Sequence, residues 1–134
     1  MAWQFDNDRS IYIQLVEQIQ NRIIVGEYSP GSKLASVRDL AAEAEVNPNT
    51  MQKALTALED MGLVYAVRTS GRFVTEDLEL IKKLKHQSAA EVVKEFKNKM
   101  HLLGFCQQEI VEMVTSSQQD IRREWNNDQM RRID

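Results

Sequence analysis

Apolar side chains in the first part of the chain recur with a helical period. Between residues 11 and 25 they stand three and four positions apart, which predicts an amphipathic helix with one face on a core. Gly26 stands where such a helix would end, and residues 28–33 concentrate turn formers around Pro30 and Gly31. The sequence therefore predicts a helix followed by a plain loop.

Two capping signals predict the next two helices. The Ser36 hydroxyl can accept from a free backbone amide while Asp39, three residues on, reaches back in a capping box, so a short helix is expected over roughly residues 37–44. Asn47 followed by Pro48 predicts the start of a third helix, because asparagine caps well and proline at the first helical position loses no hydrogen bond. The backbone amides that follow Pro48 should then stand free at the positive end of this helix.

The third helix is expected to have two unlike faces. Its apolar stripe consists of Met51, Ala54, Leu55 and Leu58. Its other stripe is polar, carries a single charge, and consists of Asn49, Gln52, Lys53 and Thr56. Since residues three and four apart share one face of a helix, the apolar stripe predicts a core contact and the polar stripe predicts a recognition surface.

The pattern changes twice after the third helix. Residues 63–67 and 72–75 read as two short strands around Arg-Thr-Ser-Gly, which predicts a β-hairpin. Residues 76–103 contain no proline or glycine and keep apolar positions at helical spacing, so one long amphipathic helix is expected there. Gly104 ends it, a further helix follows, and the last ten or so residues are expected to fray.

The order of these elements predicts a mainly α fold with a small β-hairpin wing. Residues 1–75 would form a winged helix-turn-helix, and residues 76–134 a helical unit. Two helices have too little interior to be stable alone, so the second unit is expected to pack against its copy in a homodimer. The residues expected at this interface are Leu84, Val92, Val93, Phe96, Met100, Phe105, Ile110 and Met113. An effector pocket among them stays open, but a dimer core is the favoured interpretation.

Composition and charge narrow the class of protein. With 134 residues, 43% of them hydrophobic and 28% charged, the chain has the composition of a soluble globular protein. It lacks the apolar run of ~18 residues that a membrane span needs, its start does not resemble a signal peptide, and it has one cysteine, so a cytoplasmic location is expected. Residues 1–75 carry seven basic and nine acidic side chains, so binding to nucleic acid must depend on where the cations stand.

The reactive side chains do not support an enzyme. His86 and His101 are fifteen residues apart, Cys106 is the single cysteine, and no glycine-rich phosphate loop or paired catalytic cluster occurs. We therefore expect no catalytic residues, no metal site and no cofactor.

Several blocks of sequence, in order, resemble the GntR family of bacterial transcription regulators. They cover roughly the first 75 residues and consist of Tyr-Ile-Gln-Leu at 12–15, Gly-Glu-Tyr-Ser-Pro-Gly-Ser-Lys-Leu at 26–34, Ser-Val-Arg-Asp-Leu-Ala at 36–41, Val-Asn-Pro-Asn-Thr at 46–50, Leu-Glu-Asp-Met-Gly at 58–62 and the wing at 68–74. The short helical C-terminal part resembles the YtrA subfamily, whose members carry a two-helix dimerisation unit in place of a large ligand-binding domain. The resemblance implies a dimeric repressor of its own operon, which in such regulators often encodes an ABC-type transporter.

The residues expected to contact double-stranded, pseudo-palindromic operator DNA lie on the second and third helices and on the wing. They are Ser36, Arg38, Asn49, Thr50, Gln52, Lys53, Arg68, Ser70, Gly71 and Arg72. The resemblance assigns Arg38 to DNA, and its length and charge suit a phosphate or a guanine edge. Gln52 and Lys53 are the expected base readers, because glutamine suits adenine and lysine suits guanine.

The other candidates have positional roles. Asn49 and Thr50 stand at the start of the third helix, where free amides would anchor a phosphate. Arg68 and Arg72 flank the hairpin tip and suit the minor groove or its phosphates. For Ser36, a helix cap and a phosphate contact are both open.

Two departures from the family pattern concern the turn and the wing. Ala35 stands where relatives often have the proline of Leu-Pro-Ser, which should loosen a turn. Thr69 and Arg72 stand in a wing that in relatives often reads Arg-Gly-x-Gly-Thr, so its conformation and contacts are open.

The alternative function is a winged helix that docks a protein partner without contacting DNA. A docking surface should present aromatic or aliphatic anchors. The exposed stripe expected on the third helix is polar, which favours DNA. Whether a small-molecule effector exists stays open.

Overall fold

The computed structural model describes residues 1–116, which fall into two compact units, residues 1–87 and residues 88 onward. The first unit thus extends past the boundary that the sequence predicts at residue 75. The predicted fraying of the last residues lies outside the described part of the chain.

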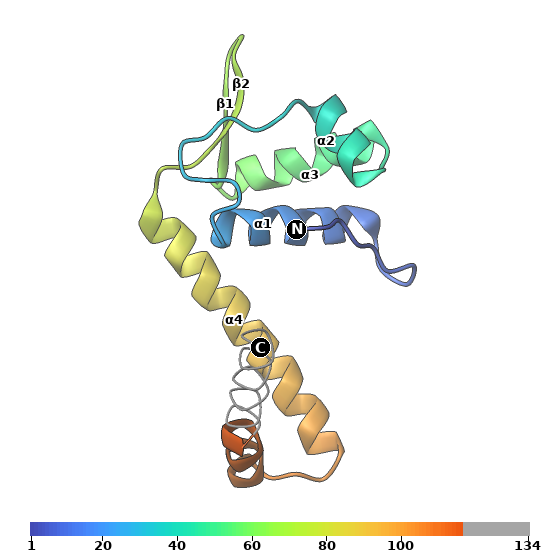
Figure 1. Ribbon diagram of the computed structural model, residues 1–134, viewed down its shortest axis with the longest axis vertical. Helices are drawn as coiled ribbons and strands as arrows, with labels where there is room; N and C mark the ends of the chain where they lie inside the picture. The colour runs from blue at the N-terminus through green and yellow to red at the C-terminus, as the bar shows by residue number, and fades with distance from the viewer. Residues whose placement is uncertain (117–134) are drawn as a thin grey trace, which may run out of the picture. The chain divides into compact units, whose positions relative to one another are not determined.

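The N-terminal unit is a winged helix-turn-helix (Figure 1). Its helices are α1 (Ile11–Ile24), α2 (Val37–Ala44) and α3 (Pro48–Asp60), and its wing consists of β1 (Val64–Val67) and β2 (Gly71–Val74). The strands are antiparallel, with Val64 opposite Val74 and Val67 opposite Gly71. The predicted mainly helical fold with a β-hairpin wing is confirmed, and α2 and α3 start where the capping signals of Ser36 and Asn47 place them.

The loop predicted before α2 contains backbone pairing that the sequence analysis missed. The Leu34 N–H donates to the Arg72 carbonyl at 2.9 Å, and the Val74 N–H donates to the Ser32 carbonyl at 2.9 Å. Lys33 therefore lies opposite Phe73 as an isolated antiparallel bridge. The outer edge of β2 is covered by this segment, which attaches the wing to the chain before α2.

The core explains why the unit continues past the wing. The apolar stripe predicted on α3 is buried, with Met51, Ala54 and Leu58 0% exposed and Leu55 1% exposed. The last helix of the unit, α4 (Leu78–Leu102), adds Ile81 to this core, and Leu84 packs against it half-buried. The first turns of α4 thus belong to the N-terminal unit.

The C-terminal unit contains the rest of α4 and a further helical stretch over residues 107–116. Gly104, with φ at 92°, lies in the turn that separates these two helical segments. The Cys106 N–H donates to the Glu109 carboxylate at 3.1 Å, which satisfies one free amide at the start of the second stretch and lowers the Glu109 pKa. Among residues 1–116, no helix is long and apolar enough to cross a membrane.

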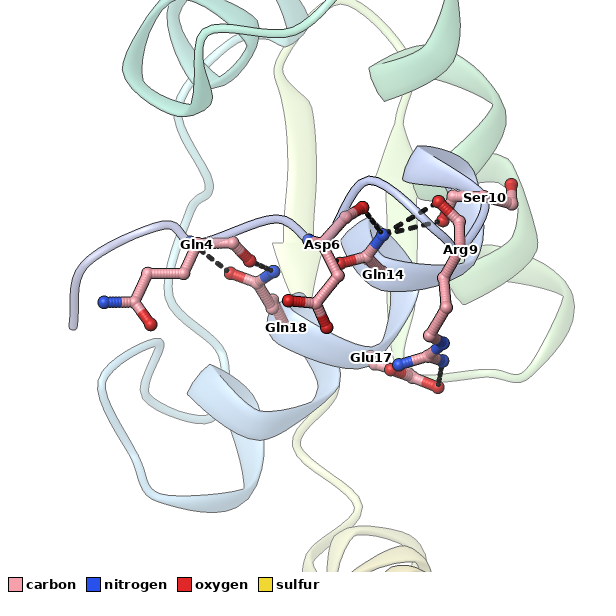
Figure 2. Close-up of polar contacts among 7 residues, drawn as sticks. All are labelled: Gln4, Asp6, Arg9, Ser10, Gln14, Glu17 and Gln18. Carbon is pink, nitrogen blue, oxygen red and sulfur yellow. Dashed lines mark hydrogen bonds and ion pairs between the residues drawn. The ribbon is translucent and has the colours of Figure 1, made fainter.

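An N-terminal arm, residues 1–9, lies along α1 and is held by glutamine side chains (Figure 2). The buried Gln14 amide accepts from the Asp6 N–H at 2.7 Å and donates to the carbonyls of Asp6 and Arg9 at 2.9 and 3.0 Å. Gln18 exchanges two hydrogen bonds with the backbone of Gln4. Gln14 thus satisfies backbone groups of the arm as a neighbouring strand would.

Removing the Gln14 amide should release the arm. We expect Gln14→Ala to lower the free energy of unfolding by about 2 kcal/mol, because a buried amide loses four hydrogen bonds with a net worth of roughly 0.5 kcal/mol each. Urea unfolding would measure this, with the exposed Gln87→Ala as the control. Equal midpoints for both variants would show that the arm does not contribute to stability.

Candidate nucleic-acid interface

The turn between α2 and α3 is closed by local hydrogen bonds. The Ser36 hydroxyl accepts from the Asp39 N–H at 3.1 Å, which is the Ser36 half of the predicted capping box. Glu45 ends α2 in the left-handed region with φ at 56°, and the Val46 N–H donates to the Ala41 carbonyl at 3.0 Å. These contacts fix the direction in which α3 leaves the turn.

One expectation at the start of α3 is wrong. The Asn49 amide was expected to stand free for a phosphate, but its N–H donates to the Asn47 side-chain oxygen at 2.8 Å. The cap predicted for Asn47 is thus formed and uses this amide. Any contact that Asn49 makes outside the protein must come from its exposed side chain.

The polar stripe of α3 faces outward. Asn49, Gln52, Lys53 and Thr56 are exposed, and Thr50 is half-buried. The Thr56 hydroxyl donates to the Gln52 carbonyl at 3.0 Å, so one member of the stripe is already bonded to its own helix. Arg38 on α2 is exposed as well. The predicted base readers, Gln52 and Lys53, are therefore accessible.

A groove beside this stripe includes a residue that the sequence analysis did not select. It is lined by Tyr12, Gln52, Lys53, Thr56, Ala57 and Asp60. Tyr12 comes from the first turn of α1 and is 38% exposed. Its apolar spacing predicted a core position, and no local signal places it next to α3, which is forty residues away in the sequence.

The wing presents its candidate residues unequally. Arg68, Ser70 and Gly71 are exposed at the hairpin tip. Arg72 is different, because its Nε lies 2.5 Å from the Glu59 carboxylate on α3 and its side chain is 20% exposed. The Arg72 charge is thus paired within the protein, and the ion pair links the wing to α3.

The departure at Thr69 has a conformational cost. The Ser70 N–H donates to the Val67 carbonyl at 3.0 Å, which closes a turn with Thr69 at its third position and φ at 71°. A β-branched residue is strained in this left-handed region, where glycine is not. This explains physically why a glycine suits the position in related wings.

Glycine at position 69 should therefore stabilise the wing. We expect Thr69→Gly to raise the free energy of unfolding by up to about 1 kcal/mol, since the left-handed strain exceeds the added entropy of the unfolded chain. The same exchange at Thr56, inside α3, should destabilise the protein instead. Urea midpoints measured for both variants would decide; an unchanged or lower midpoint for Thr69→Gly would contradict the strain.

The residues predicted for the dimer interface differ in exposure. Val92, Val93, Phe96 and Met113 are exposed, at 66%, 53%, 41% and 42% respectively. Met100 and Phe105 are half-buried, Ile110 is 5% exposed, and Leu84 packs against the core of the N-terminal unit. Contacts within the chain therefore already cover Leu84 and Ile110.

Comparison with known proteins shows to which family this fold and interface belong. Residues 11–74 match the family described as "Bacterial regulatory proteins, gntR family". The chain is 38% identical over 111 residues to the uncharacterized HTH-type transcriptional regulator YhcF of Bacillus subtilis, covering 83% of this chain and 92% of that protein. The chain belongs to the GntR family.

Two further matches refine the position within the GntR family. The HTH-type transcriptional repressor YtrA of Bacillus subtilis is 39% identical over 67 residues, which are 50% of this chain and 52% of YtrA. The structure of a GntR family transcriptional regulator from Listeria monocytogenes superimposes with a TM-score of 0.79 at 38% identity, covering 84% of this chain and 98% of that one. Relatives of this size accord with the predicted YtrA subfamily.

These matches also decide the class of protein. The GntR family and the relatives named above are transcription regulators and not enzymes, so the prediction that this chain is not an enzyme is confirmed. The chain is a DNA-binding transcription regulator with a winged-helix fold.

Proposed function

We propose that this GntR regulator is a cytoplasmic homodimeric repressor that binds a pseudo-palindromic operator in its own promoter. The observation that carries the proposal is the outward polar stripe of α3, and Arg38 on α2 is exposed as well. Gln52 and Lys53 would read base edges in the major groove, and Arg38 would contact a phosphate or a guanine. Repression is supported by the name of its relative YtrA, a transcriptional repressor.

The other predicted DNA contacts divide into helix and wing. On the helices, Ser36 acts first as a cap, and the side chains of Asn49 and Thr50 would border a phosphate. At the wing tip, Arg68, Ser70 and Gly71 would approach the minor groove or its phosphates.

Dimerisation would use the exposed apolar side chains of the C-terminal unit, chiefly Val92, Val93, Phe96 and Met113. Apolar residues on a short helical unit are stabilised when a second copy covers them. Two winged helices held in this way would meet half-sites about one turn of DNA apart, which is why a pseudo-palindrome is expected.

The alternative is a protein-docking winged helix. A docking surface would be expected to present large apolar anchors, whereas the exposed side chains of α3 are polar apart from Pro48 at its start. By the family resemblance, the operon that this repressor controls would encode an ABC-type transporter.

Fluorescence anisotropy with labelled DNA from the chain's own promoter region, across a salt series, tests the proposal. Tight binding that resists random competitor DNA and weakens steeply with salt is expected, with a slope of about 0.9 per phosphate contacted. Equal affinity for promoter and random DNA at every salt concentration would contradict an operator at this promoter. Chromatin immunoprecipitation with sequencing would then identify the genes bound.

A further inference from the structure

Two observations on the wing suggest a DNA contact that the sequence analysis did not select. Arg72, predicted to be the second cation of the wing, is bound to Glu59 at 2.5 Å. Lys33, which lies outside the hairpin in the sequence, is exposed and bridges Phe73 on β2. The wing therefore has a cation that is not part of its own two strands.

The Lys33 side chain crosses toward the hairpin tip. A Cβ placed on Gly71 would lie 3.2 Å from the Cε of Lys33 and 3.9 Å from its Nζ. The Lys33 side chain thus passes close to the backbone of Gly71. Because Gly71 has no side chain, it leaves room for this lysine. Lys33 ends beside Gly71, which directly follows the exposed tip residue Ser70 in the sequence.

Charge separates Lys33 from Arg72. Lys33 takes part in none of the ion pairs found among residues 1–116, so its ammonium group is available to an external anion. Arg72 shares its charge with Glu59, and both side chains are largely covered, at 20% and 28% exposed. Of these two cations, Lys33 is the one that can neutralise a phosphate without first breaking an internal contact.

We propose that Lys33 is a phosphate-contacting residue of the wing, and that Arg72 instead positions the wing through its ion pair with Glu59. The proposal rests on the proposed function, since it assigns one more residue to the same DNA interface. A lysine is a flexible point charge, so it suits a backbone phosphate better than a base edge. The contact should add affinity without adding sequence preference.

The experiment compares Lys33→Gln with the unsubstituted protein on two labelled duplexes, the promoter region and a mixed sequence, across a salt series. We expect the same fold loss of affinity on both duplexes, and a salt slope lower by about 1 for each wing, hence about 2 for a dimer. Lys33→Arg should keep the slope of the unsubstituted protein.

Two further variants test whether the effect of Lys33→Gln reflects a lost phosphate contact. They distinguish it from a general loss of positive charge and from a disturbed structure of the wing. Lys82→Gln removes the same charge from an exposed site on α4, which follows the base of the hairpin, and should leave the slope unchanged. Arg72→Gln breaks the ion pair and should lower the midpoint of thermal unfolding, which Lys33→Gln should not do. Thermal unfolding would verify that Lys33→Gln is folded.

The outcomes are distinct. An unchanged slope in folded Lys33→Gln would overturn the assignment of Lys33, and an unchanged unfolding midpoint in Arg72→Gln would overturn the positioning role of Arg72. The proposed function stands in both cases. Failure of the unsubstituted protein to bind either duplex at any salt would overturn the proposed function and this assignment with it.

Discussion

Alanine at both Arg38 and Lys53 is expected to reduce operator affinity at least a hundredfold. Both side chains are exposed, one on α2 and one on the outward stripe of α3. A bidentate base contact contributes about 1–3 kcal/mol of discrimination, and each substitution occurs twice in a dimer. The measurement is anisotropy on promoter DNA at a fixed salt concentration near 0.1 M.

The two single variants should affect DNA binding in different ways. Lys53→Ala should bring the affinities for operator and random DNA closer together, because the stripe of α3 reads bases. If Arg38 contacts a phosphate, Arg38→Ala should weaken binding to both by a similar factor and lower the salt slope. A matched pair, Lys82→Ala with Lys83→Ala on α4, removes equal charge and should change the affinity little.

Retention of full operator affinity by folded Arg38→Ala/Lys53→Ala would show that α2 and α3 do not form the DNA interface. The docking alternative would then gain support, and a search for a protein partner would follow. A loss of affinity with an unaltered preference for operator over random DNA would keep the interface but remove Lys53 as a base reader.

Local signals in the sequence were sufficient for most of the N-terminal fold. Ser36 and Asn47 mark helix starts because a cap acts on amides two or three residues away. The apolar stripe of α3 predicted its buried face because helical spacing alone decides which side chains share a side. Both inferences needed only neighbours in the sequence.

Contacts between distant residues were not predictable in the same way. The segment with Lys33 reads as a turn because its serines, proline and glycine lack the alternation of a strand, yet its backbone pairs with β2. The partner of Arg72 is Glu59 on another element, and no spacing rule connects the two. Gln14 likewise gives no local sign that it satisfies the backbone of the arm.

The wing is therefore the part of the site where the structure differs most from the expectation drawn from the sequence. The sequence identified two arginines near a hairpin tip as equivalent, and only the ion pair with Glu59 distinguishes them. The departure at Thr69 from the family pattern is visible in the sequence, but the strain there follows only from the φ of 71° in the turn.

Aspartate at both Val92 and Phe96 should convert the proposed dimer to a monomer. The two residues are four apart on α4, share one face and are 66% and 41% exposed. If a partner covers this face, each dimer would have to bury four new carboxylates, which costs several kcal/mol. Sedimentation equilibrium at micromolar protein would measure the change in mass.

The control is Asn98→Asp, an exposed change on the opposite side of the same helix that also introduces a carboxylate. It should leave the dimer intact. A Val92→Asp/Phe96→Asp protein that still sediments as a dimer would place the interface elsewhere and would remove these residues from it.

Loss of the dimer should also separate the two halves of operator recognition. Val92 and Phe96 belong to the unit that begins at residue 88, so the winged helix keeps its own core and its exposed stripe. A linked pair of winged helices binds its second half-site at a high effective concentration, and avidity of this kind is typically worth about 10²- to 10⁴-fold. The variant should therefore lose affinity for a full operator by such a factor while binding a single half-site as the unsubstituted protein does. Weakened half-site binding would instead show that the substitutions disturb the winged helix itself.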